Sequence, residues 1–151
     1  MDSLTTIQAS ALTVAQQHSL ETFYRALSDK NPNLLDEAVT SDWQDIPLAS
    51  GQVAGPEGLK QLMPMFFTAF PDLQIVIDDV ISQPGRAGVR ARIVGTHNGE
   101  IFGLQPTGKP VSIVLHEFHN FDNDRISHTW HLEDWFGMIQ QIGAWPLPPQ
   151  H

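Results

Sequence analysis

Residues 126–142 read Ile-Ser-His-Thr-Trp-His-Leu-Glu-Asp-Trp-Phe-Gly-Met-Ile-Gln-Gln-Ile, and their pattern changes from alternating to helical part-way along. The alternating half predicts a strand, because successive side chains of a strand point to opposite faces of a sheet. The helical half predicts a short C-terminal helix. One face of the strand would carry His128, Trp130, Leu132 and Asp134, and the other Thr129, His131 and Glu133.

This strand holds an unusual density of side chains that exchange protons. Two imidazoles and two carboxylates fall within seven residues, and Trp130 and Trp135 frame them. The alternative interpretation is an edge strand whose polar side chains are simply solvated. The rest of the chain favours a functional site, because it supplies a pocket around this strand.

Length and composition predict one folded domain over residues 1–151, with an ordered core from about residue 10 to about residue 144. The apolar fraction of 41% is that of a globular chain. We expect the first ten residues and the proline-rich segment 145–151 to be irregular.

Charge and cysteine content exclude several classes of protein. The formal charge is −9, from 8 basic and 17 acidic residues, so the chain should repel nucleic-acid phosphates. The absence of cysteine excludes disulfides, thiolate catalysis and cysteine-ligated metals. It suits a reducing compartment, and we expect a cytoplasmic protein. The N-terminus lacks the pattern of a signal peptide, and no apolar segment approaches membrane-spanning length.

Two helices are predicted from apolar residues that recur at helical spacing. The first covers about residues 13–30, with a stripe made by Leu20, Phe23, Tyr24 and Leu27. The second runs from Pro56 to Phe70 and has the strongest periodicity in the chain, although Pro64 should kink it. We expect its stripe to pack on a sheet as core; a cofactor-binding box is the alternative. A short helix is expected over 34–39. The stripe of the second helix consists of Leu59, Leu62, Met63, Phe66, Phe67 and Phe70.

The remainder of the chain is predicted to be mostly strand. Alternating segments lie at 73–81, 89–93, 111–121 and from 126 onward, and turn residues separate them. Segment 42–47 is short and ends in a proline, which predicts a brief strand or bend rather than a central strand. Helices followed by an antiparallel meander indicate an α+β fold, in which the helices close a curved sheet into a cone with an internal cavity.

Several short motifs, in this order and spacing, resemble the SnoaL-like polyketide cyclase family, also called ester cyclases. They are Phe-Pro-Asp-Leu at 70–73, Gly-Thr-His-Asn-Gly at 95–99, Pro-Thr-Gly-Lys-Pro-Val at 106–111, Trp130 followed by Asp134, Gly137, and Gln-Ile-Gly at 141–143. The resemblance covers about residues 23–143. It implies the NTF2-like α+β cone, a cavity between sheet and helices, and a homodimer. It also implies an intramolecular aldol ring closure by an acidic residue without metal or cofactor.

Asp134 best matches the acidic position of the family, and the resemblance therefore implies that it is the general acid/base. An apolar surround would raise the pKa of such a carboxyl, as one group serving both roles requires. His128 or His131 would assist by polarising a carbonyl or relaying the proton. The alternative role for Asp134 is an N-cap of the helix that follows, and the two roles do not exclude each other.

The substrate-binding residues are expected to surround the same cavity. His116 and His119 are three apart on a predicted strand, so they should point to opposite faces and at most one should reach the pocket. Where many relatives have Glu-His before the tryptophan, this chain has His128-Thr129, which suggests a substrate other than an aromatic polyketide. The expected binding residues are His116, His119, Trp130, Trp43, Asp45 and Phe66.

A metal site is conceivable from the histidines at 116, 119, 128 and 131 together with Glu117, but no fixed ligand spacing supports it. We therefore predict no metal and no cofactor. Two classes of function remain: a cyclase or isomerase acting on a small apolar carbonyl compound, and a non-catalytic protein that binds a small ligand. A pure dimerisation module would instead have a filled cavity. A catalytic acid inside the cavity favours the enzyme, and an Asp134 on the surface favours the binding protein.

Overall fold

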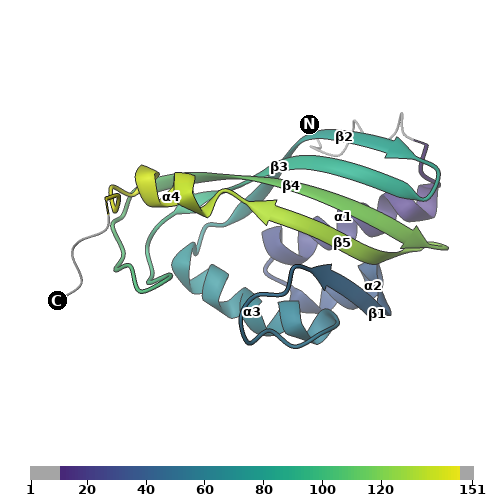
Figure 1. The fold of residues 1–151 in the computed structure, drawn as a ribbon, viewed down its shortest axis with the longest axis horizontal. Helices are drawn as coiled ribbons and strands as arrows, with labels where there is room; N and C mark the ends of the chain where they lie inside the picture. The colour runs from purple at the N-terminus through teal and green to yellow at the C-terminus, as the bar shows by residue number, and fades with distance from the viewer. Residues whose placement is uncertain (1–10, 147–151) are drawn as a thin grey trace.

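The computed structural model describes residues 11–146 and shows an α+β fold, as predicted (Figure 1). A five-stranded sheet has the order β1-β5-β4-β3-β2, and α1, α2 and α3 lie against one of its faces. Of the ends expected to be irregular, 1–10 and 145–151, residues 1–10 and 147–151 lie outside the described residues. The elements are α1 (Val14–Ser28), η2 (Pro32–Leu34), α2 (Leu35–Ala38), β1 (Val39–Ile46), α3 (Pro56–Ala69), β2 (Gln74–Gln83), β3 (Arg86–Thr96), β4 (Pro110–Asp122), β5 (Arg125–Glu133) and α4 (Trp135–Gln141).

Local sequence explains where the two long helices begin. Thr13 caps α1, because its hydroxyl accepts from the backbone N–H of Gln16 while the Gln16 side chain accepts from the backbone N–H of Thr13. Pro56 occupies the first position of α3, where its missing N–H costs no hydrogen bond. The predicted limits of both helices agree with the structure to within a few residues.

The largest difference from the predicted fold is β1. The structure shows an eight-residue strand instead of the predicted brief strand or bend over 42–47, and it pairs in parallel with β5 at the edge of the sheet. Pro47 ends it, and the edge position agrees with the sequence argument against a central strand. The other three pairings are antiparallel, as the meander predicts.

The hydrophobic core lies between the sheet and the helices. Leu20 and Phe23 of α1 pack with Met63 of α3 and with inward residues such as Ile113 and Ile126. The stripe of α3 is divided between two environments. Met63 and Phe70 are fully buried, whereas Leu59, Leu62 and Phe66 are half-buried because they face a cavity.

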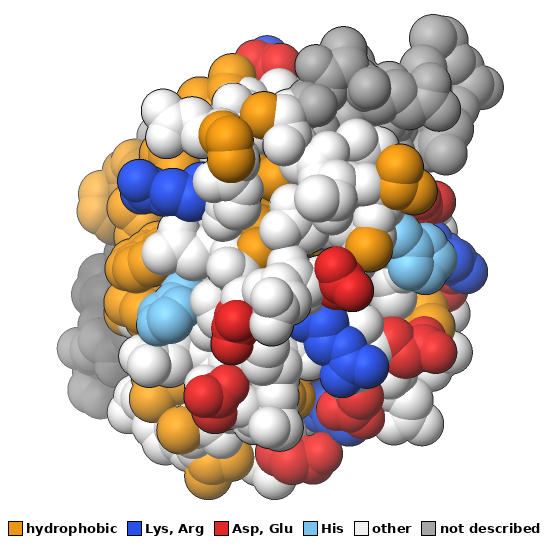
Figure 2. Space-filling view, turned by 90° about the vertical axis from the view of Figure 1, so that its right-hand side faces the viewer, with side chains coloured by type: hydrophobic (Ala, Val, Ile, Leu, Met, Phe, Trp, Pro, Cys, Tyr) orange, Lys and Arg blue, Asp and Glu red, His pale blue; other side chains and the backbone are white. Residues whose placement is uncertain are grey.

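Charged side chains on the end of the molecule drawn in Figure 2 are interspersed, with acidic and basic groups side by side. Exposed ion pairs occur on the protein surface, such as Arg25 with Asp29 at 3.0 Å. None of the helices within residues 11–146 is both long and apolar enough to cross a membrane.

Candidate active site

A cavity of about 180 Å³ lies between the concave face of the sheet and helices α1 and α3. Its walls are mainly apolar, and polar side chains gather at one side. The apolar walls include Phe23, Leu27, Leu59, Phe66, Ile75 and Leu115. The polar lining consists of Tyr24, Asp45, Gln52, Glu117, His131 and Glu133.

The two faces of β5 have different environments. His131 and Glu133 point into the cavity, and Thr129 is buried on the same face. Trp130 and Leu132 point outward and are 37% and 74% exposed. The inward face is therefore the one that carries Thr129, His131 and Glu133, and the face with Asp134 is turned away from the helices.

His131 is held between two carboxylates. Its Nδ1 lies 2.8 Å from Oε1 of Glu133, and its Nε2 lies 3.1 Å from Oδ1 of Asp45 and 2.8 Å from the Pro47 carbonyl oxygen. Burial disfavours the imidazolium, but the hydrogen bonds to Asp45 and Glu133 outweigh burial and raise the pKa of His131 to about 11. His131 is thus a cation at neutral pH whose two N–H groups are already engaged. Gln52 holds the other oxygen of Asp45, with its Nε2 at 2.7 Å.

Glu117 on β4 is buried among the cavity walls and lies opposite His131 in the sheet register. Burial, together with the negative charges of Glu133 and Asp45, raises the pKa of Glu117 to about 8, although Tyr24 and His131 oppose the shift. The carboxyl group of Glu117 is therefore largely protonated at neutral pH, close to the point at which it loses its proton.

Four buried side chains form a chain of hydrogen bonds behind Glu117. Trp43 Nε1 donates to Thr129 Oγ1 at 3.0 Å, Thr129 Oγ1 lies 2.9 Å from His119 Nδ1, and His119 Nε2 lies 2.8 Å from the Tyr24 hydroxyl. Burial lowers the pKa of His119 to about 3, so this imidazole is neutral at physiological pH. Tyr24 lines the cavity together with Glu117, and its hydroxyl lowers the pKa of that carboxyl.

Asp134 is exposed and lies outside the cavity. Its Oδ1 accepts a hydrogen bond from the backbone N–H of Gly137 at 2.8 Å, and it is the N-cap of α4. This confirms the capping interpretation. The expectation that an apolar surround of Trp130 and Trp135 encloses Asp134 is wrong, because Trp130 points to the outer face of the sheet while Trp135 lines the cavity.

The other predicted site residues divide between the cavity, the core and the outer face. Asp45, Phe66 and His131 line the cavity. Trp43 and His119 are fully buried beside it without lining it. His128 and Trp130 stack on each other outside, with ring centroids 5.6 Å apart, and His116 is exposed on that face. His116 and His119 do point to opposite faces, as predicted.

Four polar side chains of the cavity, Tyr24, Gln52, Glu117 and Glu133, are absent from the predicted set. One signal points to Glu117. The inward residues of β4 alternate as Val111, Ile113 and Leu115, and the next two inward positions are Glu117 and His119. An acidic side chain that continues an apolar alternation is expected inside.

The histidines considered as metal ligands are separated by the sheet, since His116 and His128 lie on one face and His119 and His131 on the other. Within residues 11–146, no three His, Asp or Glu side chains form a group that could hold a metal ion. The absence of a metal or cofactor stays a prediction.

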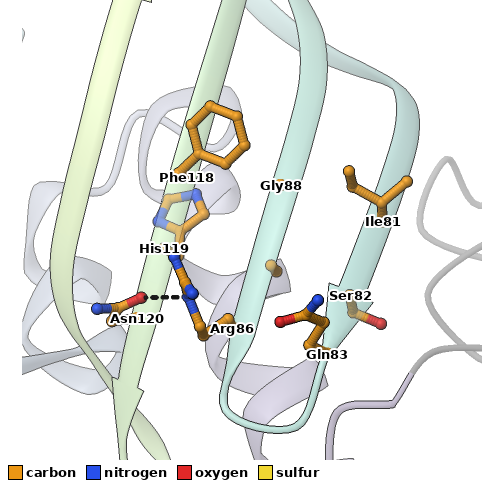
Figure 3. A pocket seen from close by; sticks show the side chains of 9 residues that line it. Ile81, Ser82, Gln83, Arg86, Gly88, Phe118, His119 and Asn120 are labelled. Carbon is orange, nitrogen blue, oxygen red and sulfur yellow. Dashed lines mark hydrogen bonds between the residues drawn. The ribbon is translucent and has the colours of Figure 1, made fainter.

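A second pocket, of about 350 Å³, lies at the hairpin end of β2, β3 and β4 (Figure 3). Ile81 and Phe118 stand on either side of Gly88, where a Cβ atom would come within 3.1 Å of both side chains. Arg86 donates to Asn120 Oδ1 at 3.2 Å. His119 touches this pocket, but its ring nitrogens bond to Tyr24 and Thr129. The acid/base groups therefore belong to the cavity on the helical side.

Comparison with protein families agrees with the fold. The model of the SnoaL-like polyketide cyclase family matches residues 18–142. The chain belongs to the SnoaL-like polyketide cyclase family. The resemblance drawn from the short motifs is thus confirmed. No curated protein matches this SnoaL-like chain.

Solved structures similar to this SnoaL-like protein share its fold at low sequence identity. TsrD from Streptomyces laurentii is 22% identical with a TM-score of 0.78, covering 86% of this chain and 96% of TsrD. A candidate polyketide cyclase from Bacillus cereus is 24% identical with a TM-score of 0.75, covering 89% and 91%. AclR, a candidate hydroxylase from Streptomyces galilaeus, is 23% identical with a TM-score of 0.75, covering 89% and 85%. Since their names differ in reaction, the shared fold does not determine the chemistry.

Proposed function

We propose that this protein is a cyclase or isomerase that uses acid/base chemistry, without a cofactor, on a small apolar carbonyl compound in the cavity. The observation that carries the proposal is a pair of carboxyl groups in one apolar cavity with different surroundings. Glu117 is kept protonated by burial, and Glu133 accepts a hydrogen bond from a cationic His131. Two carboxyl groups with such different surroundings can serve as the acid and the base of one reaction.

Glu133 would act as the base in an aldol-type ring closure. Its carboxylate removes the proton from the carbon next to the substrate carbonyl, and the resulting enolate attacks a second carbonyl in the same molecule. Glu117 would then donate its proton to the alkoxide that forms. The proton taken by Glu133 returns to Glu117 directly or through solvent, so the net reaction is an isomerisation.

The remaining polar groups support these roles without reacting. His131 keeps a positive charge beside Glu133 and Asp45, and Gln52 fixes Asp45. The cavity of about 180 Å³ is smaller than the roughly 300–1,000 Å³ of typical drug-sized ligand sites. This supports a small substrate rather than an extended aromatic polyketide.

The test is a screen of small diketones, keto esters and lactones for turnover, followed by NMR of the products. Glu117→Gln and Glu133→Gln should each reduce turnover about 10²–10⁴-fold, as expected for loss of a general acid or base. Asp134→Asn is the matched control, because it makes the same carboxyl-to-amide change outside the cavity and keeps the cap. Unchanged turnover in Glu117→Gln would contradict the proposal.

A non-catalytic binding protein is the second candidate, favoured by the predominantly apolar walls of the cavity and by the surface position of Asp134. It predicts that small ketones raise the melting temperature of the protein equally in wild type and Glu117→Gln, with no product formed. The homodimer and the cytoplasmic location expected from the sequence stay predictions.

A further inference from the structure

The hydrogen-bonded chain Trp43–Thr129–His119–Tyr24 contains more polar groups than packing of the core requires. All four side chains are at most 3% exposed, and they come from β1, β5, β4 and α1. An apolar core would fill the same space without the cost of burying hydrogen-bonding groups. The chain ends at Tyr24, which lines the cavity beside Glu117.

The indole of Trp43 sets the direction in which hydrogen bonds are donated along this chain. An indole N–H only donates, so Trp43 makes Thr129 Oγ1 an acceptor. Within residues 11–146, Trp43 and His119 are the hydrogen-bond partners of the Thr129 hydroxyl, so its hydrogen goes to His119 Nδ1. A neutral imidazole that accepts at Nδ1 carries its proton on Nε2. His119 Nε2–H therefore donates to the Tyr24 oxygen.

The direction at Tyr24 follows from the direction at His119. Because the Tyr24 oxygen accepts from His119, its own hydrogen points away from His119. Glu117 lines the same cavity as Tyr24, and its carboxyl is the acceptor whose pKa the Tyr24 hydroxyl lowers. In the opposite tautomer, Tyr24 would donate to His119, the Thr129 hydrogen would be buried without an acceptor, and Glu117 would receive no hydrogen bond from Tyr24.

We propose that Trp43, Thr129 and His119 are positioning residues that hold the Tyr24 hydroxyl as a donor aimed at the Glu117 carboxyl. The direction of the hydrogen bonds follows from the contacts alone, whereas its role in catalysis rests on the proposed function of Glu117. His119 takes no part as an acid or base, because burial keeps it neutral.

The donor from Tyr24 acts on a carboxyl that several charges face. Asp45 from β1 and Glu133 from β5 are anions, and His131 from β5 is a cation. Burial and the two anions raise the pKa of Glu117, while the Tyr24 hydroxyl lowers it. Breaking the chain should therefore raise the pKa of Glu117 further, and leave it protonated to a higher pH.

Thr129→Val and Thr129→Ser form a matched pair for the test. Valine keeps the shape of threonine and removes the hydroxyl, whereas serine keeps the hydroxyl. The first measurement is ¹⁵N NMR of the His119 ring at neutral pH, with its signals assigned by their loss in His119→Gln. Wild type and Thr129→Ser should show the Nε2–H tautomer, and Thr129→Val should show a mixture or the Nδ1–H tautomer.

Two results overturn the proposed direction. One is an Nδ1–H tautomer in the wild-type protein, which needs no variant to detect. The other is an unchanged Nε2–H tautomer in a folded Thr129→Val protein, which would mean that Thr129 does not set the direction. Trp43→Phe provides a second route, because it should weaken the tautomer preference even if Thr129→Val fails to fold.

The second measurement is the midpoint of the Glu117 carboxyl titration by ¹³C NMR, assigned by its loss in Glu117→Gln. Thr129→Val and Tyr24→Phe should both raise the midpoint above that of wild type, and Thr129→Ser should leave it unchanged. A purely structural chain would change the melting temperature in Thr129→Val without moving the Glu117 midpoint, and that outcome overturns the positioning role. Since these readouts need no substrate, failure of the proposed function in the turnover screen would be a separate result.

Discussion

Glu117 shows how burial converts an ordinary carboxyl into an acid that works near neutral pH. Its inward position on β4 removes water, and its anionic neighbours add to the cost of ionisation. The same shift has a consequence for the stability of the fold. Between its ordinary pKa of 4.5 and the folded value of about 8, the folded protein binds more protons at this residue than the unfolded chain does.

We expect the contribution of Glu117 to the free energy of unfolding to be fully present below about pH 4.5 and to be lost as pH rises through about 8. The slope is at most about 1.4 kcal/mol per pH unit. Glu117→Gln removes this dependence, while His119 and His131 titrate in both proteins. Urea denaturation at several pH values should therefore show wild type losing stability relative to Glu117→Gln as pH rises. A difference that is independent of pH would contradict the raised pKa.

Asp134 is expected to matter for stability alone. Asp134→Ala removes the acceptor of the Gly137 N–H and should lower the free energy of unfolding by about 1 kcal/mol. Asp134→Asn retains a good cap and should change the free energy of unfolding by only about a few tenths of a kcal/mol. Urea denaturation measures both. A large loss of turnover in Asp134→Asn, at unchanged stability, would restore Asp134 as a catalytic candidate.

The sequence predicts which site residues of β5 share a face better than it predicts which of the two faces points into the cavity. Alternation groups His131 with Glu133 and Trp130 with Leu132, as the structure does. Hydrophobicity normally decides which group is buried, but here the apolar pair faces outward and the charged pair faces the cavity. The ion pair of His131 with Asp45 of β1 stabilises this reversed arrangement, and a local pattern cannot show it.

Among the elements, α3 combines core packing with a wall of the cavity. Phe66 stacks on Trp135, with ring centroids 5.9 Å apart and planes within 3° of parallel. Because Phe66 is only half-buried, its truncation should cost less than the roughly 3–5 kcal/mol of a fully buried phenylalanine.

We expect Phe66→Ala to lower the free energy of unfolding by about 2 kcal/mol and to enlarge the cavity, so that bulkier ketones bind. Phe67→Ala is the matched control, since Phe67 is also half-buried but does not line the cavity. Denaturation and ligand-induced thermal shift separate the two effects. If both variants change ligand size preference equally, Phe66 does not bound the binding space.

Elements with strong local periodicity were predictable, whereas the length and the pairing of β1 were not. The apolar spacing of α1 and α3 and the alternation of β3 and β4 are each visible within one segment. The β1 strand depends on a partner that lies far along the chain, since it pairs with β5. A parallel pairing of this kind leaves no turn or local motif in the sequence.

At the scale of the whole molecule, the outer face of the sheet carries adjacent apolar side chains. Phe118 is 57% exposed and lies opposite Trp130, and Leu132 lies opposite the exposed His116. Ile81 continues this group across Gly88. Exposed apolar groups that adjoin one another are typical of interaction surfaces.

The homodimer implied by the family resemblance should therefore use this outer face. Phe118→Asp and Leu132→Asp should each reduce the molar mass measured by light scattering from that of two chains to that of one, with the fold retained in circular dichroism. Val14→Asp is a control, because Val14 is exposed on α1 on the other side of the sheet. A wild-type protein that is monomeric at high concentration would contradict the prediction.

The parallel pairing of β1 with β5 determines when the site comes into existence as the chain is synthesised. Trp43 and Thr129, which bond across this pairing, are separated by 86 residues. A ribosome that has released β1 through β4 has therefore produced all of Asp45, Tyr24 and Glu117, but neither Thr129 nor His131 has emerged. Until β5 has been synthesised, one edge of β4 is unpaired and can associate with other chains. Molecules that bind the cavity can act on this protein only after β5 has been synthesised, whereas chaperones that cover exposed strand edges would act before that point.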